Sequence, residues 1–400
     1  MITRAMIGAP LVLATHRPPW PLDNGSRIRT ARLAQGLSER FDLTLVTFAD
    51  GPVYDDTLAS RADLEQLLPG ARIELVPFGR PHPRGARRGV ARRGSVTWGA
   101  YDTPSMRAAL ARVMSERPEA LLHLDGPGAA LAGLGLAPGL AVYSGHNIEH
   151  RIVREVLARR PLTHRPFLEV EWRKIALEER RCWRAADLCV AVSEPDAEVM
   201  LAGGARRVEV VPNGADAHDP LPVARRAEGD PLRLMFVGSG AYWPYEHGLA
   251  WFAQEVMPLL GASSPVAFDV VGERPEAPVA GEGIAYHGRV PDVRPFYESA
   301  HGLVVPVFEG SGTRLKLVEA AMFGRPVIST ALGAEGLPLR AGDHYARAET
   351  PSEWVAAVEQ LSSGALDQMP ARARAALADY TWPRIADSLA ETYAQMTSTR

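Results

Sequence analysis

The chain has few of the features that define secreted, zinc-binding and membrane-spanning proteins. It contains 400 residues but only two cysteines, Cys182 and Cys189. Two cysteines seven positions apart on a predicted helix provide neither a disulfide framework nor a zinc site. No apolar run approaches the length of a membrane span, and the run at residues 10–14 is too short for the core of a signal peptide. We therefore predict a cytoplasmic protein.

The charge balance argues against a nucleic-acid partner. The formal net charge is −3, so no general field attracts polyanions. An arginine-rich segment at residues 80–94 lacks interleaved aromatic residues, and no DNA- or RNA-binding motif accompanies it. This segment fits either an ordinary mobile loop or a weak peripheral contact with an anionic acceptor or the inner face of a membrane. Residues 151–184 are also rich in arginine, but their glutamates largely offset that charge.

Strands and helices alternate along most of the chain, which predicts an α/β fold with doubly wound parallel sheets. A break rich in proline, alanine and arginine at residues 218–231 separates two such regions. We expect an N-terminal domain at residues 1–217, a linker at 218–231 and a C-terminal domain at 232–378. Each domain is long enough to bury its own core. A final helix, residues 379–400, completes the chain.

The most informative segment is GSGTRLKLVEAAMFGRPVIST, residues 310–330. It joins a predicted strand to a predicted helix through a glycine-rich turn, where free N–H groups favour a phosphate. Lysine occurs at only two of the 44 basic positions, Lys174 and Lys316, and a lysine is not interchangeable with an arginine. Glu319 lies about 4.5 Å further along the helix and could accept hydrogen bonds from a ribose diol. The same residues also fit a solvated helix start with an ordinary Lys–Glu pair.

This segment, together with GAEGL at residues 333–337, resembles glycosyltransferase family 4, whose members have the GT-B fold. The resemblance implies two Rossmann-like domains that face each other across a cleft, with the last helix crossing back to the first domain. It also implies a nucleotide-sugar donor bound by the second domain. The residues expected to bind that donor are Gly238, Ser239, Arg289, Gly310, Ser311, Gly312, Thr313, Arg314, Lys316 and Glu319.

In open α/β sheets, ligands bind beyond the carboxyl ends of the strands, and three further groups follow predicted strands of the first domain. His146 ends one strand, and the resemblance assigns it a catalytic role near the transferred sugar. The resemblance also assigns Glu319 a catalytic role, through contact with the donor nucleotide. Asp125, Asn147 and Glu149 are candidate contacts for the acceptor. The remaining group is a loop that could approach the donor diphosphate or the acceptor, formed by Asn24, Gly25, Ser26 and Arg27. Each of these groups also fits a structural role in a turn.

Two departures from the family pattern bear on activity. Many members carry an arginine and a lysine in the loop after the first strand of the second domain, but residues 239–246 contain no cation. Many members also carry a pair of glutamates, of which the second matches Glu319 and the first corresponds to Ser311. Glu309 is two residues from that position. A catalytically silent GT-B-like partner subunit is therefore one alternative, and a nucleotide-sugar epimerase of the same architecture is another.

The resemblance predicts a retaining, metal-independent hexosyl- or related glycosyltransferase of bacterial glycan, glycolipid or glycoside biosynthesis. It would move a sugar from a nucleotide diphosphate-sugar, a UDP- or GDP-sugar, to an acceptor hydroxyl. No cofactor is expected besides this co-substrate, and no Asp-x-Asp pair suits a metal–diphosphate complex. Catalysis would be mainly electrostatic.

Overall fold

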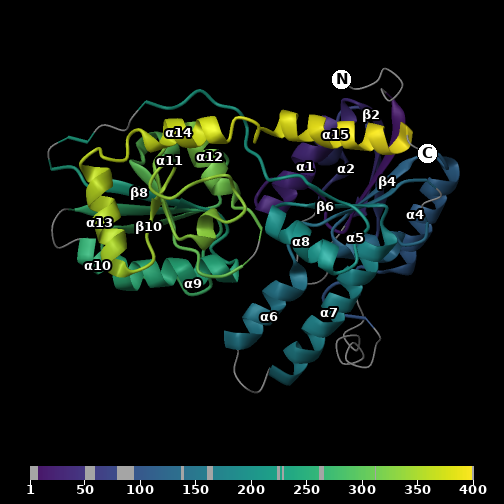
Figure 1. The fold of residues 1–400 in the computed structure, drawn as a ribbon, viewed down its shortest axis with the longest axis horizontal. Helices are drawn as coiled ribbons and strands as arrows, with labels where there is room; N and C mark the ends of the chain where they lie inside the picture. The colour runs from purple at the N-terminus through teal and green to yellow at the C-terminus, as the bar shows by residue number, and fades with distance from the viewer. Residues whose placement is uncertain are drawn as a thin grey trace. The chain divides into compact units, whose positions relative to one another are not determined.

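The computed structural model describes residues 8–49, 59–78, 94–136, 139–159, 165–222, 226–227, 229–260, 265–310 and 312–398. Two compact units account for the chain (Figure 1). Unit 1 contains Met1–Leu22, Ser26–Pro212 and Pro383–Arg400, and unit 2 contains Asp23–Gly25 and Asn213–Trp382. Ser311 and residues 80–93 of the arginine-rich segment lie outside the described residues. The domain boundaries proposed from the sequence stay a prediction.

The described part of unit 1 contains a parallel sheet of seven strands in the order β3-β2-β1-β4-β5-β6-β7. The strands are β1 (Ala9–Thr15), β2 (Phe41–Phe48), β3 (Arg72–Val76), β4 (Leu121–Asp125), β5 (Ala141–Ser144), β6 (Leu188–Ala191) and β7 (Val208–Val210). Thr15 at the end of β1 pairs with Asp125 at the end of β4, which in turn pairs with Ser144 of β5. The carboxyl ends of the three central strands therefore meet at one edge.

Helices cover both faces of this sheet. They are α1 (Gly25–Ser38), α2 (Arg61–Leu67), α4 (Pro104–Glu116), α5 (Pro127–Gly133), α6 (Glu149–Arg159), α7 (Arg165–Ala185), α8 (Glu194–Ala202) and α15 (Trp382–Ser398). Apolar residues of α4, α5, α7 and α8 form one core with the strands. On α15, Asp387 forms an ion pair with Arg40 at the end of α1, and Tyr393 packs against Phe41 of β2.

Unit 2 contains a parallel sheet of six described strands in the order β10-β9-β8-β11-β12-β13. The strands are β8 (Leu232–Val237), β9 (Val266–Val271), β10 (Ile284–Gly288), β11 (Gly302–Val305), β12 (Val327–Ser329) and β13 (Ala346–Arg347). Helices α11 (Arg294–Ser299), α12 (Leu315–Phe323) and α14 (Met369–Ala376) contribute to one core. Helices α9 (Trp243–Trp251), α10 (Met257–Leu260) and α13 (Pro351–Ser362), with the π-helical turn η2 (Phe252–Val256), contribute to the other. A 3₁₀ turn, η3 (Leu332–Ala334), follows β12.

These sheets confirm the predicted α/β fold with doubly wound parallel sheets. Two helices, α1 and α9, begin earlier in the chain than the sequence predicts, and each follows a loop that holds candidate site residues. The predicted loop at residues 16–28 ends early because α1 begins at Gly25, and Asn24 occupies the preceding position, where asparagine favours a helix start. Likewise α9 begins at Trp243 and not near residue 248, with Pro244 in its first turn, a favourable position for proline. Within the described residues, none of the helices combines the length and apolarity of a membrane span.

Candidate functional site

The glycine-rich turn of unit 2 leads directly into α12. Gly310 and Gly312 have φ angles of +103° and +78°, a region that residues with a side chain rarely adopt. The residue before the helix, Arg314, makes no side-chain cap. Within the described residues, the N–H groups of Leu315 and Lys316 therefore have no side-chain acceptor and can bind an external one. Asn213 Nδ2 donates to the carbonyl oxygen of Thr313 at 3.1 Å. The turn thus presents a fixed helix N-terminus of the kind that binds anions.

Lys316 lies in the first turn of α12, with its ammonium buried between two aromatic rings. Its Nζ is 3.5 Å from the ring centre of Phe236 and 3.6 Å from that of Tyr245. Among the described residues, no atom accepts a hydrogen bond from this ammonium. Burial, together with the nearby charge of Arg314, holds the pKa of Lys316 well below its ordinary value. The two ring faces offset part of that cost through cation–π attraction, but the three N–H donors remain available.

The loop after β8 passes over this ammonium. A Cβ on Gly238 would lie 3.0 Å from Nζ of Lys316, and a Cβ on Gly272 would lie 2.1 Å from the carbonyl oxygen of Gly238. The ends of β8 and β9 are therefore in direct backbone contact, which a side chain at Gly272 would disrupt, whereas a side chain at Gly238 would press on Lys316. Lys316 of α12 therefore places a cationic side chain beside the start of this loop, whose own residues 239–246 contain none.

Arg314 plays a different part from Lys316. It is buried, and its guanidinium donates to the carbonyl oxygen of Gly312 in the same turn. A Cβ on Gly310 would lie 3.3 Å from its Nη2. Arg314 therefore supports the shape of the glycine turn as well as adding positive charge near it.

Glu319 lies one turn beyond Lys316 and is held by a tyrosine. The hydroxyl of Tyr297, itself fully buried, donates to Oε2 of Glu319 at 2.8 Å. Burial raises the pKa of Glu319 to about 7, so the carboxyl changes charge near neutral pH. This position suits the predicted role as an acceptor for a diol.

Ser239 and Arg289 belong to a polar network at the edge of β8, β9 and β10. Ser239 Oγ donates to Oε2 of Glu273 at 2.8 Å, and Nη2 of Arg289 lies 3.2 Å from Oε1 of the same carboxylate. Nη1 of Arg289 is 2.8 Å from Oδ2 of Asp23, which also belongs to unit 2. Both predicted donor contacts are thus partnered within the protein.

Glu309 is directed toward α9. Its side chain is buried, and Oε1 lies 3.2 Å from Nδ1 of His247. The predicted alternative in which Glu309 replaces the missing glutamate near Ser311 stays a prediction, because Ser311 lies outside the described residues.

In unit 1, Asp125 is the centre of a cluster at the carboxyl edge of β1, β4 and β5. Its Oδ2 accepts a hydrogen bond from Thr30 Oγ1 at 2.6 Å and lies 3.0 Å from Nε2 of His146. His146 is in the turn after β5, which ends at Ser144 and not at His146 as expected. Burial alone raises the pKa of Asp125, but His146 and the hydrogen bond from Thr30 hold it well below its usual range. The carboxylate therefore stays ionised and orients the imidazole.

Two further histidines of this cluster were missed from the sequence. His16 follows β1, its Nδ1 lies 3.3 Å from the carbonyl oxygen of Asp125, and Trp98 and Tyr101 contact its ring edge-to-face. Burial lowers the pKa of His16 to about 3. Burial likewise lowers the pKa of His123 to about 4, and its Nδ1 lies 2.7 Å from the Tyr393 hydroxyl. The carboxyl-edge rule could have identified His16, since it directly follows a strand.

The other candidates of unit 1 lie at helix starts. Glu149 begins α6, where the buried Glu179 accepts its N–H at 2.9 Å. Burial raises the pKa of Glu149 to about 8, while Asn147 hydrogen-bonds its side chain. Ser26 is exposed and Arg27 buried in the first turn of α1. Their acceptor or diphosphate roles, and that of Asn24 and Gly25, stay predictions.

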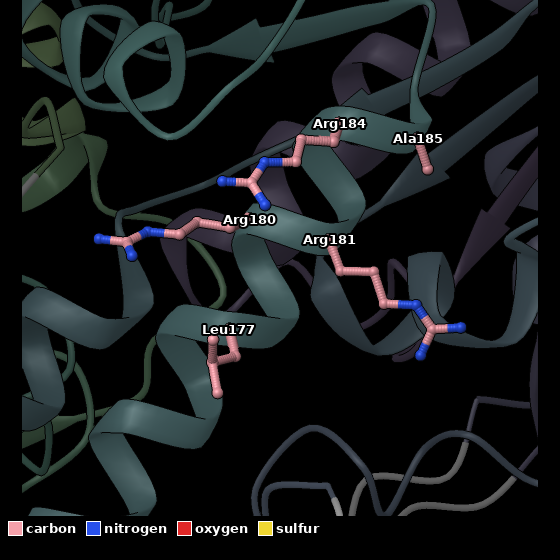
Figure 2. Close-up of a pocket in the computed structure, with 5 residues that line it drawn as sticks. All are labelled: Leu177, Arg180, Arg181, Arg184 and Ala185. Carbon is pink, nitrogen blue, oxygen red and sulfur yellow. The ribbon is translucent and has the colours of Figure 1, made fainter.

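The described residues also form a feature away from these strand edges, a depression on α7. Among the described residues, no cluster of histidine, cysteine and carboxylate side chains could hold a metal ion. A shallow depression occurs instead on α7, lined by Leu177, Arg180, Arg181, Arg184 and Ala185 (Figure 2).

Comparison with known proteins identifies the fold and the family. A model described as Glycosyltransferase Family 4 matches residues 23–219, and one described as Glycosyl transferases group 1 matches residues 231–363. No curated protein matches the chain.

Solved structures of low sequence identity share the fold. Sucrose-phosphate synthase from Thermosynechococcus elongatus is 16% identical with a TM-score of 0.73, covering 98% of this chain and 100% of that one. Anabaena HepE in complex with UDP-glucose is 16% identical with a TM-score of 0.64, covering 96% and 99%. A glycosyltransferase from Rickettsia africae is 10% identical with a TM-score of 0.63, covering 98% and 100%. The two sheets and these neighbours define a GT-B fold.

Together the two family models match most of the chain. The protein is a GT-B glycosyltransferase of the family 4 type.

Proposed function

We propose that the chain transfers a sugar from a nucleotide diphosphate-sugar to an acceptor hydroxyl with retention of anomeric configuration. The observation that carries the proposal is the buried ammonium of Lys316 at the open N-terminus of α12. Burial without a hydrogen-bonded counter-ion disfavours the charged form of this amine and lowers its pKa. A diphosphate next to Gly238 would supply that counter-ion and use the open amides of α12.

The donor would then be held by three groups of unit 2. Lys316 and the amides of α12 bind the diphosphate, and the carboxylate of Glu319 accepts hydrogen bonds from the ribose. In the reaction, the bond between the sugar C1 and the diphosphate oxygen breaks, a bond from C1 to the acceptor oxygen forms, and the proton of the acceptor hydroxyl passes to the departing diphosphate. Negative charge builds up on the departing diphosphate, where fixed cationic and amide donors stabilise it.

His146 is the proposed contact to the transferred sugar in unit 1. Its Nε2 faces Oδ2 of Asp125, which leaves Nδ1 for a ligand. We propose that Asp125 acts by positioning this ring, since the carboxylate is buried and already accepts a hydrogen bond from Thr30. Direct contact of Asp125 with the acceptor stays a prediction.

A uridine nucleotide is the donor that we test first. HepE structures contain UDP, UDP-glucose, or UDP with glucose, and UDP-glucose and GDP-mannose together cover the two expected bases. Purified protein should bind one of these donors and release the nucleoside diphosphate, with or without a chelator. Proton NMR of the first product should show that the anomeric configuration of the donor is kept.

The same experiment separates the alternatives. Binding of a donor without hydrolysis or transfer to any acceptor mixture would favour a catalytically silent subunit. Conversion of the sugar-nucleotide itself to an isomer would favour an epimerase. No binding of any nucleoside diphosphate would contradict the proposal as a whole.

A further inference from the structure

Helix α7 presents a much more positive surface than its sequence suggests. The sequence predicts that glutamates offset the arginines of residues 151–184, and the structure corrects this expectation. Three of those glutamates face inward: Glu178 accepts from the N–H of Ser95 at 2.7 Å, Glu171 from that of Thr97 at 2.8 Å, and Glu179 is fully buried. Because these carboxylates face inward, they do not form ion pairs with the arginines on the outer surface of α7.

The arginines of α7 face the other way. Arg180, Arg181 and Arg184 are exposed, and no carboxylate of the described residues pairs with them. Figure 2 shows Arg180 and Arg184 extending to one side of the helix and Arg181 to the other, and Leu177 lines the same shallow depression. Guanidinium groups arranged in this way suit phosphate oxygens, because each can donate two parallel hydrogen bonds.

Large apolar side chains precede these cations on the same helix. Phe167 is 44% exposed, Val170 45% and Leu177 66%, and they are three of the five exposed large apolar residues in the described chain. At 3.6 residues per turn, Val170, Leu177, Arg181 and Arg184 fall within an arc of about 60°. Phe167 and Arg180 lie about 40° beyond its two ends. A soluble protein rarely gathers such residues without a partner.

We propose that this face of α7 docks on an anionic lipid bilayer. The 21 residues of α7 span about 30 Å, and Figure 1 shows α6 and α7 extending together away from the sheet of unit 1. Phosphate headgroups would pair with Arg180, Arg181 and Arg184, while Leu177, Val170 and Phe167 enter the region between headgroups and acyl chains. The proposal does not depend on the sugar transfer proposed above.

The composition of the face favours a bilayer over other partners. A second copy of the same face would bring like charges together. A nucleic acid would satisfy the arginines but would leave the exposed leucine and valine without an apolar partner. A helix that extends from its unit also presents a convex surface, which fits the flat surface of a bilayer better than a groove on another protein.

The test is sedimentation of the full chain with vesicles of phosphatidylcholine alone or with about a third phosphatidylglycerol. The wild-type protein should bind the anionic vesicles and not the neutral ones. Changing Arg180, Arg181 and Arg184 together to glutamine should weaken binding by about a hundredfold, from the typical effect of one basic residue near an anionic surface. Raising the salt from about 0.1 M to about 1 M should have a similar effect, because the screening length falls from about 10 Å to about 3 Å.

Two further variants separate specific docking from general charge. Leu177→Gln keeps every charge and should still weaken binding several-fold. A triple change of Arg61, Arg112 and Arg117 to glutamine alters net charge equally but removes arginines of unit 1 that pair with carboxylates away from α7. That control should bind vesicles as the wild type does. All variants should keep the wild-type melting temperature, since the changed side chains lie at the surface.

Three results would overturn the proposal. The first is equal binding of the wild type to neutral and anionic vesicles, or no binding to either. The second is equal loss in the Arg180/Arg181/Arg184 variant and in the control, which would indicate net charge alone. The third is retention of the protein by polyglutamate or single-stranded DNA but not by vesicles, which would assign the face to a soluble polyanion.

Discussion

The two units of this protein share an architecture but use the same edge of their sheets differently. At the carboxyl edge of unit 2, glycines, an open helix N-terminus and the buried ammonium of Lys316 come together. At the corresponding edge of unit 1, the side chains of His123 and His146 flank the ionised carboxylate of Asp125, and that of His16 lies against its backbone carbonyl. The first arrangement suits an anion that is already charged, and the second suits orientation of a polar group. The residues that follow the strands, and not the fold that both units share, therefore determine which kind of ligand each edge can bind.

Removing the imidazole from unit 1 should give the largest effect. We expect His146→Ala to lower kcat by about 10²- to 10³-fold, as for other donors at a reacting centre, with donor Kd almost unchanged. His146→Gln keeps an N–H group for Asp125 but has no imidazole, so it should be nearly as slow. Single-turnover kinetics with calorimetric donor binding would check this, and full activity of the glutamine variant would contradict it.

The positioning role of Asp125 is tested by non-additivity. Asp125→Asn should lower kcat by about ten- to a hundredfold with little change in donor Kd, because the imidazole of His146 would lose its fixed orientation. The double variant Asp125→Asn/His146→Ala should be no slower than His146→Ala alone, since residues that act as a unit are not additive. Multiplied losses in the double variant would mean that Asp125 acts independently.

The nucleoside contact of unit 2 should give a smaller effect. Glu319→Gln should weaken uridine and UDP equally, by about tenfold, the typical value of a hydrogen bond to a charged group. Because the pKa of Glu319 is raised to about 7 by burial, the ionised acceptor is gained as pH rises through 7. Uridine affinity of the wild type should therefore increase between pH 6 and pH 8, and that of Glu319→Gln should stay flat. Calorimetry at the two pH values measures both.

Arg289 should give the smallest effect on donor affinity. Its guanidinium is exposed and paired with Glu273 and Asp23, and exposed ion pairs are worth at most about 1 kcal/mol. We expect Arg289→Gln to change the Kd for UDP by less than about fivefold. A loss of more than tenfold would instead support the direct donor contact predicted from the sequence.

Much of the fold could be predicted because strands and helices alternate with clear turn signals. Helix starts were harder to place: the residues of the turn before Gly25 also favour the start of a helix. The partners of Asp125 depend on strand order, which puts β4 between β1 and β5, and no local pattern gives that order. The inward direction of Glu171 and Glu178 follows from helical periodicity, since they lie seven residues apart on one face.

The geometry of Lys316 could not be predicted either. The sequence gives its charge and its place after the glycine turn, but not its burial against Phe236 and Tyr245. That burial decides how strongly it should bind an anion, because a charge without water interacts more strongly with a ligand.

Calorimetric titration of uridine and UDP into the wild type and Lys316→Met tests the central claim most directly. The other lysine gives the control, Lys174→Met on α7. We predict that Lys316→Met weakens UDP by about ten- to a hundredfold and leaves uridine unchanged, whereas Lys174→Met changes neither. Equal UDP affinity in the wild type and Lys316→Met would contradict the claim that α12 supplies the cation for the diphosphate.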